Sequence, residues 1–198
     1  CGVVFAPCRA QDRDTLVRLM EGVEDIPGTA LHEGLPWNWE TFPEYLDVLD
    51  SMPRDIDVAA YLPHGALRVY AMGERAVRRE EASAEDREIM ARLTDEAMRA
   101  GALGFATSRA IVHKSSDGEL TPMYRAERDE VLAITSTLKG RGVVQWVTDF
   151  NPFDVEWLLF LDAGKAGQGG ATFSLVQGPG APFGFRRMLS AVDHANAN

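Results

Sequence analysis

The sequence predicts an α/β fold, and more specifically a partial (β/α)8 TIM barrel of about five strand-helix units. Five short apolar runs alternate along the chain with segments whose apolar residues repeat at helical spacing. The middle runs are nearly continuous in apolar or small residues, which is typical of strands buried on both faces of a parallel sheet. This alternation favours α/β architecture with right-handed crossovers.

A doubly wound sheet fits the same alternation, and the glycine pattern helps to separate the two folds. No G-x-G-x-x-G pattern follows a predicted strand, and the segment "GKAGQGG" precedes one, which is the wrong placement for a phosphate-binding loop. The barrel is therefore favoured. A complete barrel needs about 250 residues, and the chain has 198. We therefore expect a single incomplete TIM-barrel domain over residues 1–198, without the first and last strands.

The predicted strands cover residues 1–6, 56–62, 102–107, 143–148 and 171–177. Helices are predicted between them over residues 14–20, 41–49, 83–101, 125–139, 155–163 and 185–195. Thr41 and Glu44 have the spacing of a capping box, with Pro43 in the first turn. Gly101 and Gly140 are typical helix stops.

Composition excludes several classes of function. The chain is 45% hydrophobic and 25% charged, as in a globular domain, and no apolar run approaches the ~18 residues that span a bilayer. A net charge of −10 argues against nucleic acid or anionic membrane as a partner. Two cysteines make no disulfide framework, and no signal peptide is visible, so we expect a cytoplasmic protein.

Polar residues follow the predicted strands at their carboxyl ends, where reactive groups gather in both candidate folds. The set comprises His64, then Ser108, Arg109, His113 and Lys114, then Thr148 and Asp149, and finally Ser174 and Gln177. A simple structural interpretation stays open for two of them. His64 is equally well explained as a hydrogen-bonded loop residue, and Asp149 as a turn former.

Other polar and aromatic residues are expected to have structural roles. His32 lies in a long predicted loop, Trp37 and Trp39 are expected to pack this loop onto the barrel, and Cys8 is expected to be a free thiol. His194 is expected to be exposed on the last helix. The sequence contains no H-x-H, H-E-x-x-H or paired C-x-x-C metal motif and no G-x-S-x-G elbow, so spacing alone names no chemistry.

Four strings in order resemble known blocks of one enzyme family: "CGVVFAP", "WNWETFPEYLDVLD", "PHGALRVYAMG" and "GALGFATSR". They resemble consecutive blocks of the N-acyl-D-amino-acid deacylases and their amidohydrolase relatives, over about residues 1–140. The resemblance implies a (β/α)8 barrel and zinc-assisted hydrolysis of an amide. In such a reaction the metal polarises the carbonyl and activates water, and a carboxylate moves protons.

The resemblance also implies residue roles, and the chain departs from some of them. The second-strand cysteine of the family falls on Cys1, which is thus the expected metal ligand. The H-x-H pair of the first strand and the catalytic aspartate of the last strand have no counterpart. Thr148 and Asp149 stand where the family has Thr-His, and Leu175 and Val176 stand where it has another histidine.

These observations lead to one functional prediction with two alternatives. The parent protein is expected to be a zinc-dependent hydrolase of an N-acyl-D-amino acid, with His64 and Asp149 catalytic and with Arg109, His113 and Lys114 binding an anionic substrate. The first alternative is another amide, a cyclic amide or an ester on the same scaffold. The second is that the 198 residues are inactive alone and self-associate through the open edges of the barrel.

Overall fold

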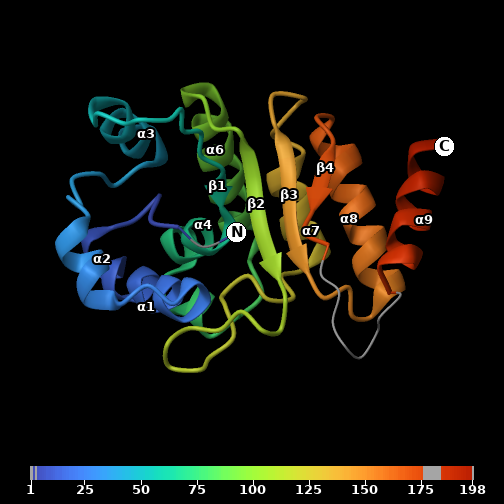
Figure 1. Ribbon diagram of the computed structural model, residues 1–198, viewed down its shortest axis with the longest axis horizontal. Helices are drawn as coiled ribbons and strands as arrows, with labels where there is room; N and C mark the ends of the chain where they lie inside the picture. Colours follow the sequence, from blue (N-terminus) through green and yellow to red (C-terminus); the bar gives the residue numbers. More distant parts are fainter. Residues whose placement is uncertain (1, 3, 176–183, 198) are drawn as a thin grey trace.

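A four-stranded parallel sheet forms the centre of the molecule in the computed structural model, which describes residues 2, 4–175 and 184–197 (Figure 1). The strands lie in the order of the chain: β1 (Leu62–Pro63), β2 (Gly104–Arg109), β3 (Val143–Thr148) and β4 (Ala171–Phe173). Each neighbouring pair is parallel. The predicted α/β class is thereby confirmed, and sequential parallel strands are the arrangement of a partial barrel.

Helices precede, connect and follow these strands, and some of them cover one face of the sheet. In chain order they are α1 (Arg13–Glu24), α2 (Gly28–Gly34), α3 (Phe42–Ser51), α4 (His64–Met72), α5 (Glu74–Val77), α6 (Ala84–Ala100), α7 (Arg128–Thr135), α8 (Phe153–Gly167) and α9 (Gly184–Ala197). In Figure 1, α6, α7 and α8 lie behind the sheet, α1 to α3 lie to its left and α9 lies at its right end. The carboxyl ends of β2 and β3 point downward in this view.

Most helix caps form as the sequence predicts, but Gly140 is not a helix stop because α7 already ends at Thr135. The Thr41 hydroxyl accepts a hydrogen bond from the Glu44 amide, and the Glu44 carboxylate accepts one from the Thr41 amide at 2.8 Å. Ser83 and Asp86 make the same reciprocal pair at the start of α6. Gly101 ends α6 in the left-handed region. These signals act over three or four residues, so they do not depend on the rest of the fold.

The core lies between the sheet and the helices behind it. All six residues of β2 are buried, and the largest side chains that are fully buried include Phe105, Trp146, Met90 and Ile134. Burying a large apolar side chain contributes about 1.5–3 kcal/mol. The sheet is therefore stabilised chiefly through its helix-covered face.

The predicted strand over residues 1–6 is wrong for its described residues, Gly2 and residues 4–6, which form no strand. The Gly2 carbonyl instead accepts a hydrogen bond from the Gly65 amide at 2.9 Å. A Cβ placed on Gly2 would lie 2.8 Å from the Ser108 amide nitrogen. The segment thus passes over the face of β2 rather than pairing along an edge.

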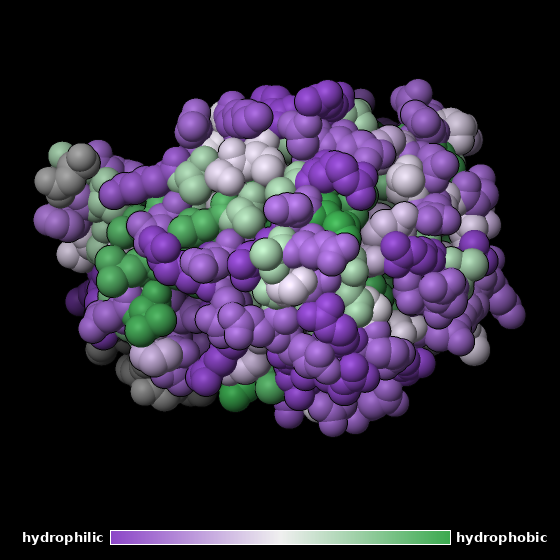
Figure 2. Space-filling view, turned by 180° about the vertical axis from the view of Figure 1, so that it is seen from behind, coloured by the Kyte–Doolittle hydropathy of each residue, from purple (hydrophilic) through white to green (hydrophobic). Residues whose placement is uncertain are grey.

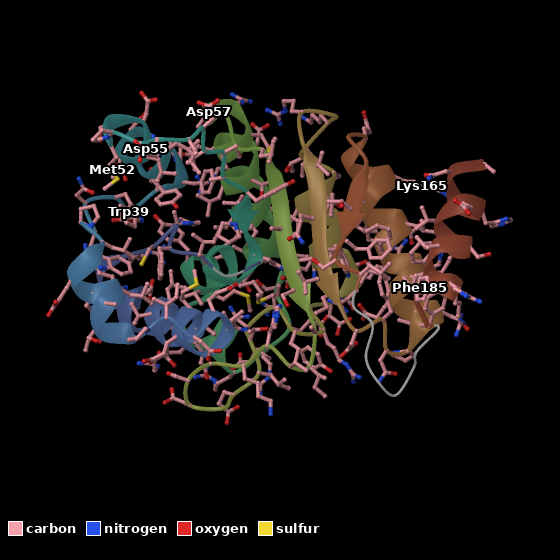
Figure 3. All side chains as sticks on the ribbon, viewed as in Figure 1. Trp39, Met52, Asp55, Asp57, Lys165 and Phe185 are labelled. Atoms are coloured by element: carbon pink, nitrogen blue, oxygen red, sulfur yellow. The ribbon has the colours of Figure 1, made fainter. Side chains whose placement is uncertain are left out.

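The predicted strand over residues 56–62 is also mostly wrong, because only Leu62 belongs to β1. Ile56 is 75% exposed and Val58 51% exposed. Asp55 and Asp57 flank Ile56 and lie at the upper left, away from the sheet (Figure 3). Ile56 and Val58 are thus exposed to solvent in spite of being apolar.

Two further differences are smaller. The strand predicted over residues 171–177 is shorter, since β4 ends at Phe173 and residues 176 and 177 lie outside the described residues. The loop predicted around His32 contains α2. By contrast, β3 coincides with its prediction, and β2 is shifted by two residues.

The surface seen from behind is mainly hydrophilic, with hydrophobic residues on the side that carries α8 and α9 (Figure 2). Val155, Leu158 and Leu189 are exposed there. Within the described part of the chain, no helix is both long and apolar enough to cross a membrane.

Gly104 provides a test of the packing between β2 and β3. A Cβ at this position would overlap the Val143 carbonyl oxygen, and the backbone has a φ of +154°. We expect Gly104→Ala to lower the free energy of unfolding by about 2–4 kcal/mol, measured by urea denaturation. Gly34→Ala is the control, because nothing lies within 4 Å of its added Cβ. Equal effects of the two substitutions would contradict this packing.

Candidate functional site

The last side chains of β2, those of residues 107–109, point alternately to the two faces of the sheet. Successive residues of a strand point in opposite directions. Thr107 and Arg109 bond to groups on or beside the helices, whereas Ser108 points to the other face, where the loop of residues 110–121 lies. The polar residues predicted at this edge are thus divided into two groups.

His64 belongs to the helix-facing group. It begins α4 directly after β1 and is fully buried. Its Nδ1 lies 2.8 Å from the Thr107 hydroxyl, and its Nε2 lies 2.7 Å from a carboxylate oxygen of Glu130 on α7. Arg68, one turn later on α4, pairs with the same carboxylate at 3.0 Å. Both ring nitrogens of His64 are therefore used within the chain.

The protonation of this cluster follows from its burial. Desolvation lowers the pKa of His64 below its ordinary value of 6.5, so the imidazole is neutral. Burial alone would raise the pKa of Glu130, but the hydrogen bond from His64 and the charge of Arg68 hold it below its ordinary value. The ionised carboxylate can only accept, so Nε2–H of His64 donates to Glu130, and Nδ1 accepts from Thr107.

Arg109 is held by a second buried carboxylate. Its Nε and Nη2 donate to the two oxygens of Glu156 on α8 at 2.7 and 2.8 Å, and its Nη1 donates to the Ala126 carbonyl at 2.7 Å. Arg109 is 5% exposed and Glu156 4% exposed. All three guanidinium nitrogens thus have partners inside the protein.

Ser108 and His113 form a pair on the opposite face. The Ser108 hydroxyl lies 2.6 Å from Nδ1 of His113. Burial lowers the pKa of His113, and the nearby Glu24 opposes this shift. The His113 side chain is half-buried, and Lys114 beside it is exposed. Ser108 is fully buried, so His113 is the member of this pair that solvent can reach.

The loop that carries His113 and Lys114 is fixed at several points. Lys114 bridges to Leu120 in antiparallel fashion, and the Ser116 amide donates to the Arg18 carbonyl of α1 at 2.9 Å. The loop lies so close to α1 that a Cβ on Gly22 would overlap the backbone of Ser115. The turn of this loop is therefore anchored on α1 below the sheet (Figure 1).

Asp149 connects the ends of β2 and β3. One carboxylate oxygen accepts from the Ile111 amide at 3.1 Å, and the other accepts from the Asn151 amide at 3.1 Å. The bond to Asn151 is that of a turn former, and the bond to Ile111 holds the loop after β2. Asp149 is exposed at the same edge.

The remaining predicted residues have varied positions. Trp37 and Trp39 are buried and stacked 5.6 Å apart, so their predicted packing role is confirmed. Cys8 is a buried free thiol, and burial raises its pKa to about 12.

His32, on α2, is partly exposed, and its Nε2 lies 3.5 Å from a carboxylate oxygen of Asp14. Cys1, the predicted metal ligand, lies outside the described residues.

The described ranges contain no group of three His, Cys, Asp or Glu side chains that could hold a metal ion. His64 and Glu130 are in contact, but Arg68 fills the remaining side of the carboxylate. The described residues thus do not fit a zinc site by themselves.

Sequence reasoning missed Glu130 and Glu156, the two carboxylates that organise the helix-facing group. His64 and Arg68 are four residues apart in "PHGALR", which puts them on one helix face and would have signalled a shared partner. No local signal identifies that partner, because it lies 66 residues from His64.

The parallel sheet, its helix cover and the polar residues at its carboxyl edge define an α/β protein of the kind that carries its functional groups at strand ends. The model of the amidohydrolase family matches residues 3–144, and the chain belongs to this family. It is 28% identical over 144 residues to a D-aminoacylase of Alcaligenes xylosoxydans xylosoxydans. This match covers 72% of the chain and 25% of the relative, so the chain spans about a quarter of that protein. No solved structure matches.

A buried and an exposed ion pair of α8 together test how much burial matters to stability. Glu156→Gln leaves the buried Arg109 without a countercharge, and we expect a loss of about 3 kcal/mol or more in the free energy of unfolding. Asp162→Asn on the same helix removes an exposed pair with Arg128, at 2.8 Å, and should cost less than about 1 kcal/mol. Chemical denaturation of both variants measures the difference. A loss of the same size in both would show that burial of the Arg109 pair is unimportant.

The pKa of His64 predicts how stability depends on pH. Because the pKa of the folded imidazole lies below 6.5, the unfolded chain binds the proton first as the pH falls. We expect the free energy of unfolding to decrease below pH 6.5, by at most about 1.4 kcal/mol per pH unit for this group. The lowered pKa of Glu130 acts in the same direction below pH 4.5. NMR titration of His64 provides the check, and protonation at or above pH 6.5 would refute the expectation.

Proposed function

We propose that the protein carrying this chain is a metal-dependent hydrolase that cleaves the amide bond of an N-acyl-D-amino acid. The observation that carries the proposal is the similarity to a D-aminoacylase over 144 residues, within the amidohydrolase family. The polar residues at the ends of β2 and β3 support it, because a parallel α/β scaffold carries its chemistry at this edge.

The substrate carboxylate is assigned to His113 and Lys114. They are neighbours on an anchored loop, one half-buried and the other exposed. In a chain with a net charge of −10, an ammonium group beside an imidazole is a local site for an anion. Arg109 was also predicted to bind substrate, but its guanidinium donates its hydrogen bonds to Glu156 and to the Ala126 carbonyl. We therefore assign it the structural role of fixing the end of β2.

Asp149 is the proposed proton carrier. Amide hydrolysis needs a group that takes a proton from water and delivers it to the leaving nitrogen. Asp149 is exposed, and backbone amides of Ile111 and Asn151 orient its two oxygens. A catalytic role for His64 stays a prediction, and its two internal hydrogen bonds favour a structural role.

Zinc and its ligand Cys1 belong to this proposal by resemblance to the family. The described residues do not assemble a site for the ion, so no step of the mechanism is derived through it. Self-association and a cytoplasmic location stay predictions from the sequence.

A different substrate on the same scaffold is the second candidate. Two departures from the deacylase pattern favour this second candidate. Asp149 follows Thr148 where the family has a histidine, and Leu175 lies near the position of a second histidine of the family. Leu175 is 44% exposed, and its side chain cannot bind a metal. A cyclic amide or an ester is then the expected substrate class.

Assays of the purified protein separate the two candidates. The proposal predicts hydrolysis of N-acetyl-D-amino acids in preference to their L enantiomers, and loss of activity with a strong chelator that zinc restores. Turnover of cyclic amides or esters alone would favour the second candidate. Chelator-resistant activity would refute metal dependence.

Lys114→Ala tests substrate binding directly. Removing one charge-assisted hydrogen bond worth about 1.5–3 kcal/mol should raise KM by about 10- to 100-fold. Lys165→Ala is the control, because Lys165 is exposed on the α8 and α9 side, away from the loop (Figure 3). Steady-state kinetics should give an unchanged KM for the control. An unchanged KM in Lys114→Ala would remove this residue from the site.

A further inference from the structure

We infer that Ser108 is a positioning residue that holds His113 as the Nε2–H tautomer, so that His113 presents a hydrogen-bond donor to a ligand carboxylate. The inference rests on the proposed function only for the identity of the ligand. The tautomer follows from the contacts of the two side chains.

The first step concerns the Ser108 hydroxyl. Ser108 is fully buried, and its oxygen lies 2.6 Å from Nδ1 of His113. Among the described residues this is the one side-chain hydrogen bond of Ser108. If Nδ1 carried the proton, the hydroxyl would accept, and its own hydrogen would be buried without an acceptor, which is unfavourable. Ser108 therefore donates, and Nδ1 accepts.

The second step concerns the other ring nitrogen. Burial favours the uncharged form of His113, and a neutral imidazole carries one proton. With Nδ1 as an acceptor, this proton is on Nε2. No described residue bonds to Nε2, and the half-buried side chain reaches solvent. Within the described residues, Nε2–H thus has no acceptor and can donate to a ligand.

The third step concerns the kind of ligand. A metal-bound histidine usually donates its second N–H to a carboxylate, a carbonyl or water. His113 has the opposite arrangement, because its second nitrogen accepts from Ser108. Nε2–H matches an acceptor oxygen of a ligand, and the exposed Lys114, next in the chain, can supply an ammonium group to a negatively charged ligand. His113 is therefore suited to an acceptor oxygen and not to a metal ion, and the proposed function makes this acceptor a carboxylate.

The adjacent residue of β2 provides an internal control. Thr107 lies on the opposite face and pairs with Nδ1 of His64 at 2.8 Å. Two consecutive hydroxyl residues thus contact two different histidines. Removing either hydroxyl should alter the signals of its own histidine alone.

NMR of the protein labelled with 15N in its four histidines tests the inference. The His113 signals, assigned with His113→Gln, should show an unprotonated Nδ1 and a protonated Nε2, with that tautomer in at least about tenfold excess. In Ser108→Ala the His113 signals should move toward a mixture of tautomers while those of His64 stay unchanged. Thr107→Val should do the reverse. A protonated Nδ1 in the unsubstituted protein overturns the inference, whether or not the variants fold.

Ligand titrations separate this inference from the proposed function. N-acetyl-D-alanine should shift the Nε2–H signal of His113, whereas zinc alone should leave it in place. A zinc-induced loss of the Nε2 proton would overturn the inference. An Nε2–H tautomer in a protein that hydrolyses no N-acyl-D-amino acid would refute the proposed function and leave the role of Ser108 intact.

Discussion

Two buried carboxylates, Glu130 on α7 and Glu156 on α8, constrain the position of the central strand. Moving a carboxylate out of water costs several kcal/mol unless charged or hydrogen-bonding partners replace the water. Glu130 obtains these partners from His64 and Arg68 of α4, and Glu156 obtains them from Arg109 of β2. Because the partners come from different elements, the ion pairs are satisfied only when sheet and helices have their native arrangement.

This arrangement determines which face of β2 carries the residues that we propose to bind a ligand. Alternation along the strand points Thr107 and Arg109 to the helix-covered face, where Thr107 hydrogen-bonds to His64 and Arg109 pairs with Glu156. Ser108, between them, faces the other way and meets His113. The loop beyond β2 is held by backbone hydrogen bonds of its own and by its contacts with α1 and Asp149. Ser108 thus lies on a strand whose opposite face is held by the buried contacts of Thr107 and Arg109.

Sequence reasoning succeeded where the signal is local and failed where it depends on distant partners. The capping box at Thr41 and the strand Val143–Thr148 were predictable because a few adjacent residues specify them. The segment around Ile56 was misjudged because apolarity alone does not reveal whether a segment is covered by others. The candidate site was only partly predictable for the same reason. Its strand-end residues can be found in the sequence, but the pairing of His64 with Glu130 across 66 residues cannot.

The two histidines that follow strands illustrate why position at a strand end is not enough to identify a functional residue. His64 begins α4 directly after β1, so the helix carries it into the layer between sheet and helices, where both ring nitrogens are consumed. His113 comes four residues after the end of β2, so the chain has room to turn and bring the imidazole ring back to Ser108. Its Nε2 has no bond to any described residue. The length of the connection after the strand therefore accounts for the difference between the two histidines. The helix that begins at once after β1 buries His64, whereas the short loop after β2 returns His113 to the carboxyl edge of the sheet.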